Sequence, residues 1–81
     1  MNVTVVLFAR PRELVGSSQV EMAMEEGSSP ETVFAAMAEQ VPALAALRAN
    51  LRVAIDDEYA DWQDTLSDGA EVAFIPPTAG G

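Results

Sequence analysis

The stretch that decides the fold is Asp68-Gly69-Ala70-Glu71-Val72-Ala73-Phe74-Ile75-Pro76-Pro77-Thr78-Ala79-Gly80-Gly81. Its first two residues are a turn signal. The apolar side chains of Val72 and Phe74 lie two residues apart, which predicts a strand from Glu71 to Ile75. The two prolines that follow have no backbone N–H to donate, so the strand must end before them. The sequence therefore predicts a last strand that leads directly into a short tail.

A second apolar strand is predicted over residues 3–8. Its two faces carry Val3, Val5 and Leu7 on one side and Thr4, Val6 and Phe8 on the other. Because both faces are largely apolar, we expect this strand in the middle of the sheet beside the last strand. A short helical turn over 10–15 should end at Gly16-Ser17-Ser18. Residues 19–24 then read as a strand that pairs with the first one, with Val20, Met22 and Met24 on one face.

A strong helix start follows at Gly27-Ser28-Ser29-Pro30-Glu31. Either Ser29 caps the helix with Pro30 at its first position, or Ser28 and Glu31 form a capping box. The buried stripe is predicted to contain Val33, Phe34, Met37 and Val41. Pro42 should stop this helix, and residues 43–47 should form a second helical piece that packs Leu44 and Leu47.

The rest of the chain is predicted to complete a single domain. Residues 52–55 read as a strand, Asp56-Asp57-Glu58 as a polar turn, and Trp62 with Leu66 as cover for the open end of the core. The fold class is therefore α+β, a mixed sheet of four to five strands with one main helix packed on one face. This order of elements is the ubiquitin-like β-grasp arrangement. We expect a β-grasp domain over 1–75 and a flexible Gly-Gly tail over 76–81.

Composition excludes several classes of function. The 81 residues include 13 acidic and four basic side chains, for a net charge of -9, which disfavours nucleic-acid binding. Cysteine, histidine and lysine are all absent, so no disulfide, thiol nucleophile or His/Cys metal site is expected. No apolar run approaches the roughly 20 residues that span a bilayer, and no signal peptide is evident. We expect a cytoplasmic protein without membrane contact, whose acidic surface would steer it towards a basic partner.

The tail offers a chemical group that suits transfer chemistry. Pro76 and Pro77 stiffen the chain, and Gly80-Gly81 ends in a carboxylate with no side chain beside it. Such a tail could enter a narrow tunnel on another protein, where the Gly81 carboxylate would need activation, for example by adenylation with ATP. The alternative is that the two glycines are a frayed end without function.

An apolar patch is expected beside the tail. If Val3, Val5 and Leu7 face the helix, Val6, Phe8, Ala73 and Ile75 share the opposite face, and Phe8 and Ile75 become candidate partner-binding residues. The alternative is that these side chains belong to the core. Arg10 and Arg12 could pair with an acidic partner or with Glu13. We interpret Trp62 as core cover and the acids Asp56, Asp57, Glu58 and Asp61 as solvated, without a metal.

Residues 68–81 resemble the C-terminal signature of the molybdopterin synthase small subunit family, which typically reads D-G-D-E-V-A-F-x-P-P-x-x-G-G. The segments Val6-Leu7-Phe8-Ala9-Arg10 and Arg12-Glu13-Leu14-Val15-Gly16 are similar to the family's opening strand and its R-E-L-x-G turn. The resemblance covers essentially the whole domain. It implies a sulfur carrier in molybdenum cofactor biosynthesis, the sulfur-donor subunit of a heterotetrameric sulfurtransferase.

The resemblance also implies a cycle and its partners. An E1-like enzyme would adenylate the Gly81 carboxylate with ATP, and a persulfide donor would convert it to a thiocarboxylate. The carrier would then insert its tail into the large catalytic subunit, where two sulfurs build the dithiolene of molybdopterin from the cyclic pyranopterin precursor. The chain itself would bind no cofactor.

The sequence departs from the family signature in three places. Ala70 replaces an acidic residue, which we expect to be a surface change; Asp56-Asp57 stands where relatives often have Asn and a turn residue; Thr78-Ala79 replaces Val-Ser or Val-Thr. Three alternatives remain: a ubiquitin-like modifier joined through Gly81 to lysines of other proteins, a passive interaction domain, and a thiamine-pathway sulfur carrier. The P-P-x-x-G-G ending fits the last of these less well.

Overall fold

The computed structural model describes residues 1–77, so the predictions for Gly80 and Gly81 lie outside the described residues. The elements follow the predicted order, and a short strand after the polar turn brings the sheet to five strands, the larger of the two predicted numbers. They are β1 (Asn2–Leu7), α1 (Ala9–Val15), β2 (Gln19–Ala23), α2 (Pro30–Gln40), the 3₁₀ helix η1 (Pro42–Asn50), β3 (Arg52–Ile55), β4 (Glu58–Ala60) and β5 (Glu71–Ile75).

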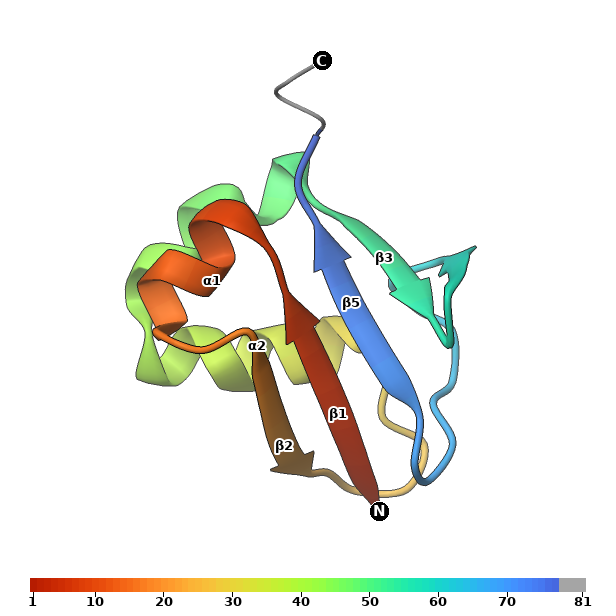
Figure 1. Cartoon of the computed structure of the whole chain (residues 1–81). Helices are drawn as coiled ribbons and strands as arrows, with labels where there is room; N and C mark the ends of the chain where they lie inside the picture. Colours follow the sequence, from red (N-terminus) through yellow and green to blue (C-terminus); the bar gives the residue numbers. More distant parts are fainter. Residues whose placement is uncertain (78–81) are drawn as a thin grey trace.

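The five strands form one mixed sheet in the order β2-β1-β5-β3-β4. β1 and β5 lie parallel in the middle, where Val5 pairs with Val72 and Leu7 with Phe74, while the other neighbours are antiparallel. The helices cover one face of this sheet, and β5 lies between β1 and β3 (Figure 1). The predicted β-grasp fold and the central position of the first and last strands are confirmed.

The core fills the space between the sheet and α2. Val5, Val33 and Val72 are completely buried there, and Phe34 and Met37 nearly so. Helix α2 begins as the first capping alternative predicts, because the Ser29 hydroxyl accepts a hydrogen bond from the backbone N–H of Thr32 at 3.3 Å. The capping box does not form. The Ser28 hydroxyl instead donates to the Glu25 carbonyl at 2.7 Å.

Pro42 stops α2 as expected, but the helical piece after it is longer than the predicted 43–47. It is a 3₁₀ helix over Pro42–Asn50 that buries Leu44 and half-buries Leu47. A nine-residue 3₁₀ helix is unusual, because its hydrogen-bond geometry is poorer than that of an α-helix. Its packing on α2 and α1 supplies the stabilisation that its local geometry does not.

Three aromatic rings close the end of the core beside η1. Trp62 stacks on Phe74 with centroids 5.4 Å apart, and Phe34 meets both rings edge-on. The Arg48 guanidinium lies over Trp62 at 3.4 Å from its ring centroid, and its Nε donates to Glu31 at 3.2 Å. This hydrogen bond and the arginine charge lower the pKa of Glu31, against the opposing effect of burial. Trp62 is core cover, as predicted.

The expectation that Ala70 is a surface residue is wrong. Its side chain is buried, with 3% of its surface exposed, and belongs to the core. Gly69, with φ 84°, turns the chain so that Ala70 lies two residues before Val72 on the same face. An acidic side chain placed here in this backbone would be desolvated, so alanine suits the position.

The turn between β3 and β4 explains the two aspartates at its tip. Asp56 and Asp57 both have positive φ values, 49° and 70°, which Asn, Asp and Gly tolerate best. The Asp56 carboxylate also accepts a hydrogen bond from the Glu71 N–H at 2.9 Å, and the Asp56 N–H donates to the Glu71 carbonyl at 2.8 Å. The turn is thereby tied to the start of β5. Glu58, predicted in the turn, is the first residue of β4.

Candidate functional site

The candidate site lies on the sheet face away from the helices, at the end where β5 leaves the sheet. Val6 pairs with Ala73 across β1 and β5, one residue out of step with the buried pair Leu7 and Phe74. Val6, Ala73 and Ile75 are half-buried, and Phe8 is 46% exposed. The predicted patch therefore exists as a surface of the folded chain, and these side chains are not core residues.

The backbone turns sharply after Phe8. Phe8 follows β1 in an extended conformation, and Ala9, the first residue of α1, has φ 51° in the left-handed region. An alanine there costs about 1–2 kcal/mol relative to a right-handed conformation. The turn directs the chain into α1, and the half-exposed Phe8 ring stays at the edge of the patch.

Sequence reasoning missed two residues of this surface. Arg52 pairs with Ile75 across β3 and β5, and Tyr59 on β4 is 71% exposed with the Arg52 guanidinium 5.9 Å from its ring centroid. For Arg52 the signal was available, since it precedes the core residue Val53 in a strand whose side chains alternate between the two faces. We call the side chains of Val6, Phe8, Arg52, Tyr59, Ala73 and Ile75 the docking face.

The docking face continues to the first residues of the tail. A pocket of about 260 Å³ is lined by Arg52, Tyr59, Ile75, Pro76 and Pro77, so the two prolines leave the domain against this surface. Pro76 is half-buried and Pro77 exposed. Residues 78–81 lie outside the described part of the chain, including the candidate reactive residue Gly81.

Within residues 1–77, no three His, Cys, Asp or Glu side chains gather as a metal site would require. Arg10 forms an exposed ion pair with Glu13 at 3.2 Å, one of the two pairings considered for it. Among these residues, none of the helices combines the length and the apolar character that crossing a membrane requires.

Comparison with protein families matches residues 5–81 to the ThiS family, which is nearly the entire chain. The chain belongs to the ThiS family. Among curated relatives, it is 35% identical over 83 residues to the molybdopterin synthase sulfur carrier subunit of Chlamydomonas reinhardtii, with both chains covered completely. It is 37% identical over 81 residues to the subunit of the same name from Escherichia coli K12, covering 98% of this chain and 99% of the relative.

Solved structures show the same fold for this ThiS-family chain. SAMP1 from Haloferax volcanii superposes with a TM-score of 0.86 at 24% identity, with both chains covered in full. A chain in the complex of subunits 1 and 2 of the molybdopterin-converting factor from Helicobacter pylori also has this fold. That structure gives a TM-score of 0.71 at 20% identity, again with complete coverage. At these identities the likeness concerns the fold.

Proposed function

We propose that this chain is the sulfur carrier subunit of a molybdopterin synthase, and that the Gly81 carboxylate carries the sulfur. The observation that supports this most strongly is the similarity to carrier subunits along the whole chain, tail included. The fold is suited to the role. β5 is held on both sides by β1 and β3, so the chain beyond Pro77 starts from a rigid base.

The proposed cycle has three partners. An E1-like enzyme adenylates the Gly81 carboxylate with ATP and releases pyrophosphate. The terminal sulfur of a persulfide donor then displaces AMP, and a second thiol reduces the resulting acyl disulfide, which leaves the thiocarboxylate on Gly81 and a disulfide on the donor side. The large catalytic subunit takes the thiocarboxylate into its active site. There the sulfur is transferred to the cyclic pyranopterin precursor. This chain binds no cofactor and acts as the sulfur-donor subunit of a sulfurtransferase in the cytoplasm, in a heterotetramer of two carriers and two large subunits.

The docking face gives the proposed carrier its contact with the large subunit. A half-exposed Phe8 and a half-buried Ile75 flank the start of the tail, and apolar side chains of this kind form the centres of protein interfaces. Arg52 and Tyr59 beside them are residue types that frequently dominate binding energy. The chain has no cysteine, histidine or lysine, so in this proposal the side chains for the chemistry belong to the partner.

Mass spectrometry of the intact chain tests the proposal. The chain is incubated with ATP, an activating enzyme and a persulfide donor, and we expect a species in which sulfur replaces one oxygen at the terminus. Deletion of Gly81 should abolish this species, whereas Glu58→Gln, an exposed change on β4, should leave it intact. The E. coli carrier subunit serves as the positive control for the activating enzyme.

Two results would contradict the proposal. One is the absence of the sulfur-containing species while the positive control is converted. The other is a set of heavier conjugates in cells that disappears when Gly81 is deleted, in a chain that never acquires sulfur. The second result would identify a protein modifier instead.

A further inference from the structure

The edge strand β2 has backbone groups that point away from the sheet. Leu7 donates its N–H to Ser18 at 2.9 Å, and Met24 donates to Met1 at 2.8 Å, at the two ends of the β1–β2 ladder. Hydrogen-bonded and non-hydrogen-bonded pairs alternate along an antiparallel ladder. The β1–β2 register therefore directs the N–H and C=O groups of Glu21 and Ala23 outward, where no described residue pairs with them.

At the start of β2, the outward backbone groups already have hydrogen-bond partners within the chain. The Ser17 hydroxyl donates to the Gln19 carbonyl at 2.8 Å, and the Gln19 N–H donates to the same hydroxyl oxygen at 3.3 Å. These bonds occupy the outward groups of Gln19. The open part of the edge is thereby restricted to Glu21 and Ala23.

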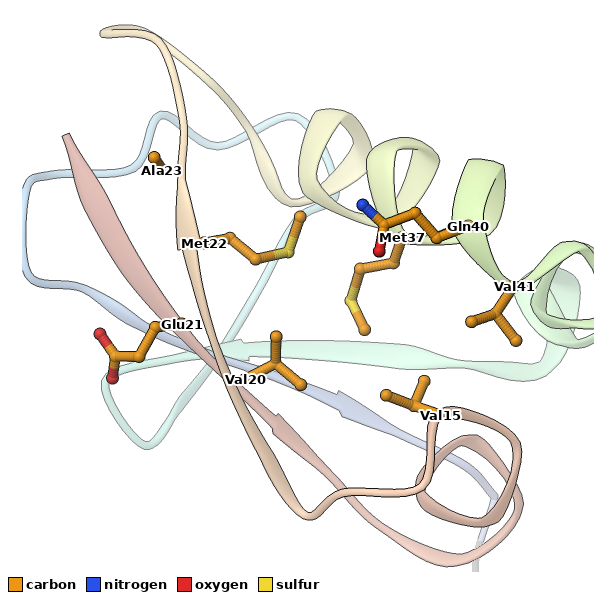
Figure 2. A pocket seen from close by; sticks show the side chains of 8 residues that line it. All are labelled: Val15, Val20, Glu21, Met22, Ala23, Met37, Gln40 and Val41. Carbon is orange, nitrogen blue, oxygen red and sulfur yellow. The ribbon is translucent and has the colours of Figure 1, made fainter.

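A groove runs beside this open edge, between β2 and the helices. It has a volume of about 310 Å³, and its lining includes Val15, Val20, Met22, Met37, Gln40 and Val41. In Figure 2, Val20 and Met22 point from β2 towards α2, whereas the Glu21 carboxylate points to the opposite side of the strand. One strand thus combines open backbone groups, an apolar groove on one face and a carboxylate on the other.

The charges around this edge are acidic. The Thr4 hydroxyl donates to one oxygen of the Glu21 carboxylate at 2.9 Å, which orients this group and leaves its second oxygen for another partner. Glu25 and Glu26 are exposed just after the strand, and no arginine lines the groove. The binding partner that complements this surface is therefore basic.

We propose that β2 and its groove bind an extended segment of a basic partner protein, which adds to the sheet as a sixth strand. The segment carries an apolar–basic–apolar sequence. Its basic residue lies opposite Glu21. The outward N–H and C=O groups of Glu21 and Ala23 provide up to four main-chain hydrogen bonds to the segment. The two neighbouring residues fall opposite Val20 and Met22, and their apolar side chains enter the groove.

Two other occupants fit the edge less well. A second copy of β2, paired about its centre, would place Glu21 opposite Glu21, and like charges directly opposite are destabilising. A small molecule would leave the outward backbone groups of Glu21 and Ala23 largely unused, and the groove is at the lower end of the about 300–1,000 Å³ typical of such sites. Because β1 separates β2 from β5, this site is independent of the tail and of the proposed sulfur transfer.

Titration of the full chain with synthetic peptides tests this inference. The probe is an acetylated and amidated Thr-Val-Arg-Val-Thr peptide, and the control is the same peptide with Glu in place of Arg. We expect the Arg peptide to bind and to slow amide hydrogen exchange at Glu21 and Ala23, followed by NMR. The Glu peptide should bind at least about fivefold more weakly, since cross-strand charge pairs contribute with either sign.

Two variants on β2 and one control variant on β4 test whether the peptide binds at β2. Glu21→Arg should reverse the preference between the two peptides. Ala23→Pro should weaken both, because it removes an outward N–H that the edge strand does not use within the fold. Glu58→Arg on β4, the opposite edge, is the matched control and should change neither affinity. Unfolding curves establish that each variant is folded.

Several outcomes would overturn the inference. They are failure of the Arg peptide to bind at millimolar concentration, binding that Glu21→Arg leaves unchanged, and slow exchange at Glu21 and Ala23 that depends on the concentration of the chain alone. The last result would identify a second copy as the occupant. An apolar dye that fills the groove and is not displaced by the peptide would identify a small-molecule site.

Discussion

Arg48 joins three parts of the chain through one guanidinium. It stacks on Trp62, it donates to Glu31 at the start of α2, and its own backbone is part of η1. Its side chain is 34% exposed, so both interactions are partly shielded from water. A planar guanidinium can stack and donate at the same time, which a lysine ammonium does less well.

Replacement of Arg48 should therefore measure the combined stabilisation from the stacking and the ion pair. We expect Arg48→Ala to lower the free energy of unfolding by about 1–2 kcal/mol, through the lost cation–π contact and ion pair. Arg48→Lys should recover only part of this loss. Urea unfolding is the measurement, and Arg10→Ala, which breaks an exposed pair, should stay within about 0.5 kcal/mol of the wild type. Equal losses for Arg48→Ala and Arg10→Ala would contradict the role of Trp62.

Glu31 should contribute a pH-dependent part of the stability. Its pKa in the folded chain is lowered from the ordinary value of 4.5, chiefly by the hydrogen bond from Arg48. A lowered folded pKa means that the contribution is present above the unfolded pKa and is lost as the pH falls through the folded pKa. Because 38% of the side chain is exposed, the effect is small.

The pH dependence can be isolated by comparing the wild type with Glu31→Gln. The wild type should have the higher urea midpoint at pH 6, and the difference should shrink as the pH is lowered below 4.5. In the variant Arg48→Ala, NMR titration should find the pKa of Glu31 raised towards its ordinary value. A difference in midpoint that grows on acidification would show that the ion pair is not its source.

At the scale of the element, β1 and β5 each have a buried face and a face for contact. Val5, Leu7, Val72 and Phe74 fill the core, while Val6, Phe8, Ala73 and Ile75 form most of the docking face. The two-residue period of a strand separates the two sets. Substitutions on neighbouring residues of one strand should therefore affect different properties of the protein.

A matched pair of phenylalanine substitutions tests this separation. Phe74 is 1% exposed, so Phe74→Ala should cost about 3–5 kcal/mol of stability. Phe8 is 46% exposed, so Phe8→Ala should cost less than about 1 kcal/mol but should weaken association with the large subunit at least tenfold. Urea unfolding and calorimetric titration give the two quantities. A large loss of stability in Phe8→Ala would contradict the assignment of the faces.

Much of this architecture could be predicted from the sequence, because it depends on local signals. The period of β1 and β5, the Ser29 cap and the Pro42 stop each act within a few residues of themselves. Phe8 and Ile75 follow from the same period. Their role in binding a partner, like that of Gly81, stays a prediction.

The features that could not be predicted depend on distant or very short segments. Tyr59 lies in a three-residue strand, too short to display a period. Glu31 and Arg48 are 17 residues apart and meet only after η1 packs on α2. The groove beside β2 depends on how α2 lies across the sheet. Ala70 is different, since its parity with Val72 was available, but the acidic residue of the family signature at this position led to the wrong assignment.

At the scale of the whole molecule, charge should govern how fast partners meet. The net charge is -9, because 13 acidic side chains outnumber the four arginines, of which Arg52 lies on the docking face. Long-range attraction by a basic partner accelerates encounter and is screened by salt, whereas close apolar contacts are affected much less.

The kinetics of association with the large subunit should separate the long-range attraction from the close apolar contacts. We expect the association rate to fall at least about tenfold between 20 mM and 500 mM salt, while the dissociation rate changes little. Stopped-flow fluorescence with Trp62 as the reporter measures both rates. The E. coli carrier subunit with its own large subunit provides a reference. An association rate independent of salt would contradict steering by the acidic surface.

The parallel pairing of β1 with β5 has a consequence for how the chain is made. Residues 4–7 find their partners at residues 71–74, almost the full length of the domain away. While residues 1–70 emerge from the ribosome, β1 and β3 lack the strand that joins them, so the centre of the sheet stays open. Contacts this distant in sequence form slowly and late. We therefore expect a chain broken off before β5 to stay unfolded, because β1 and β3 have no strand between them. Such a chain would be a substrate for proteases.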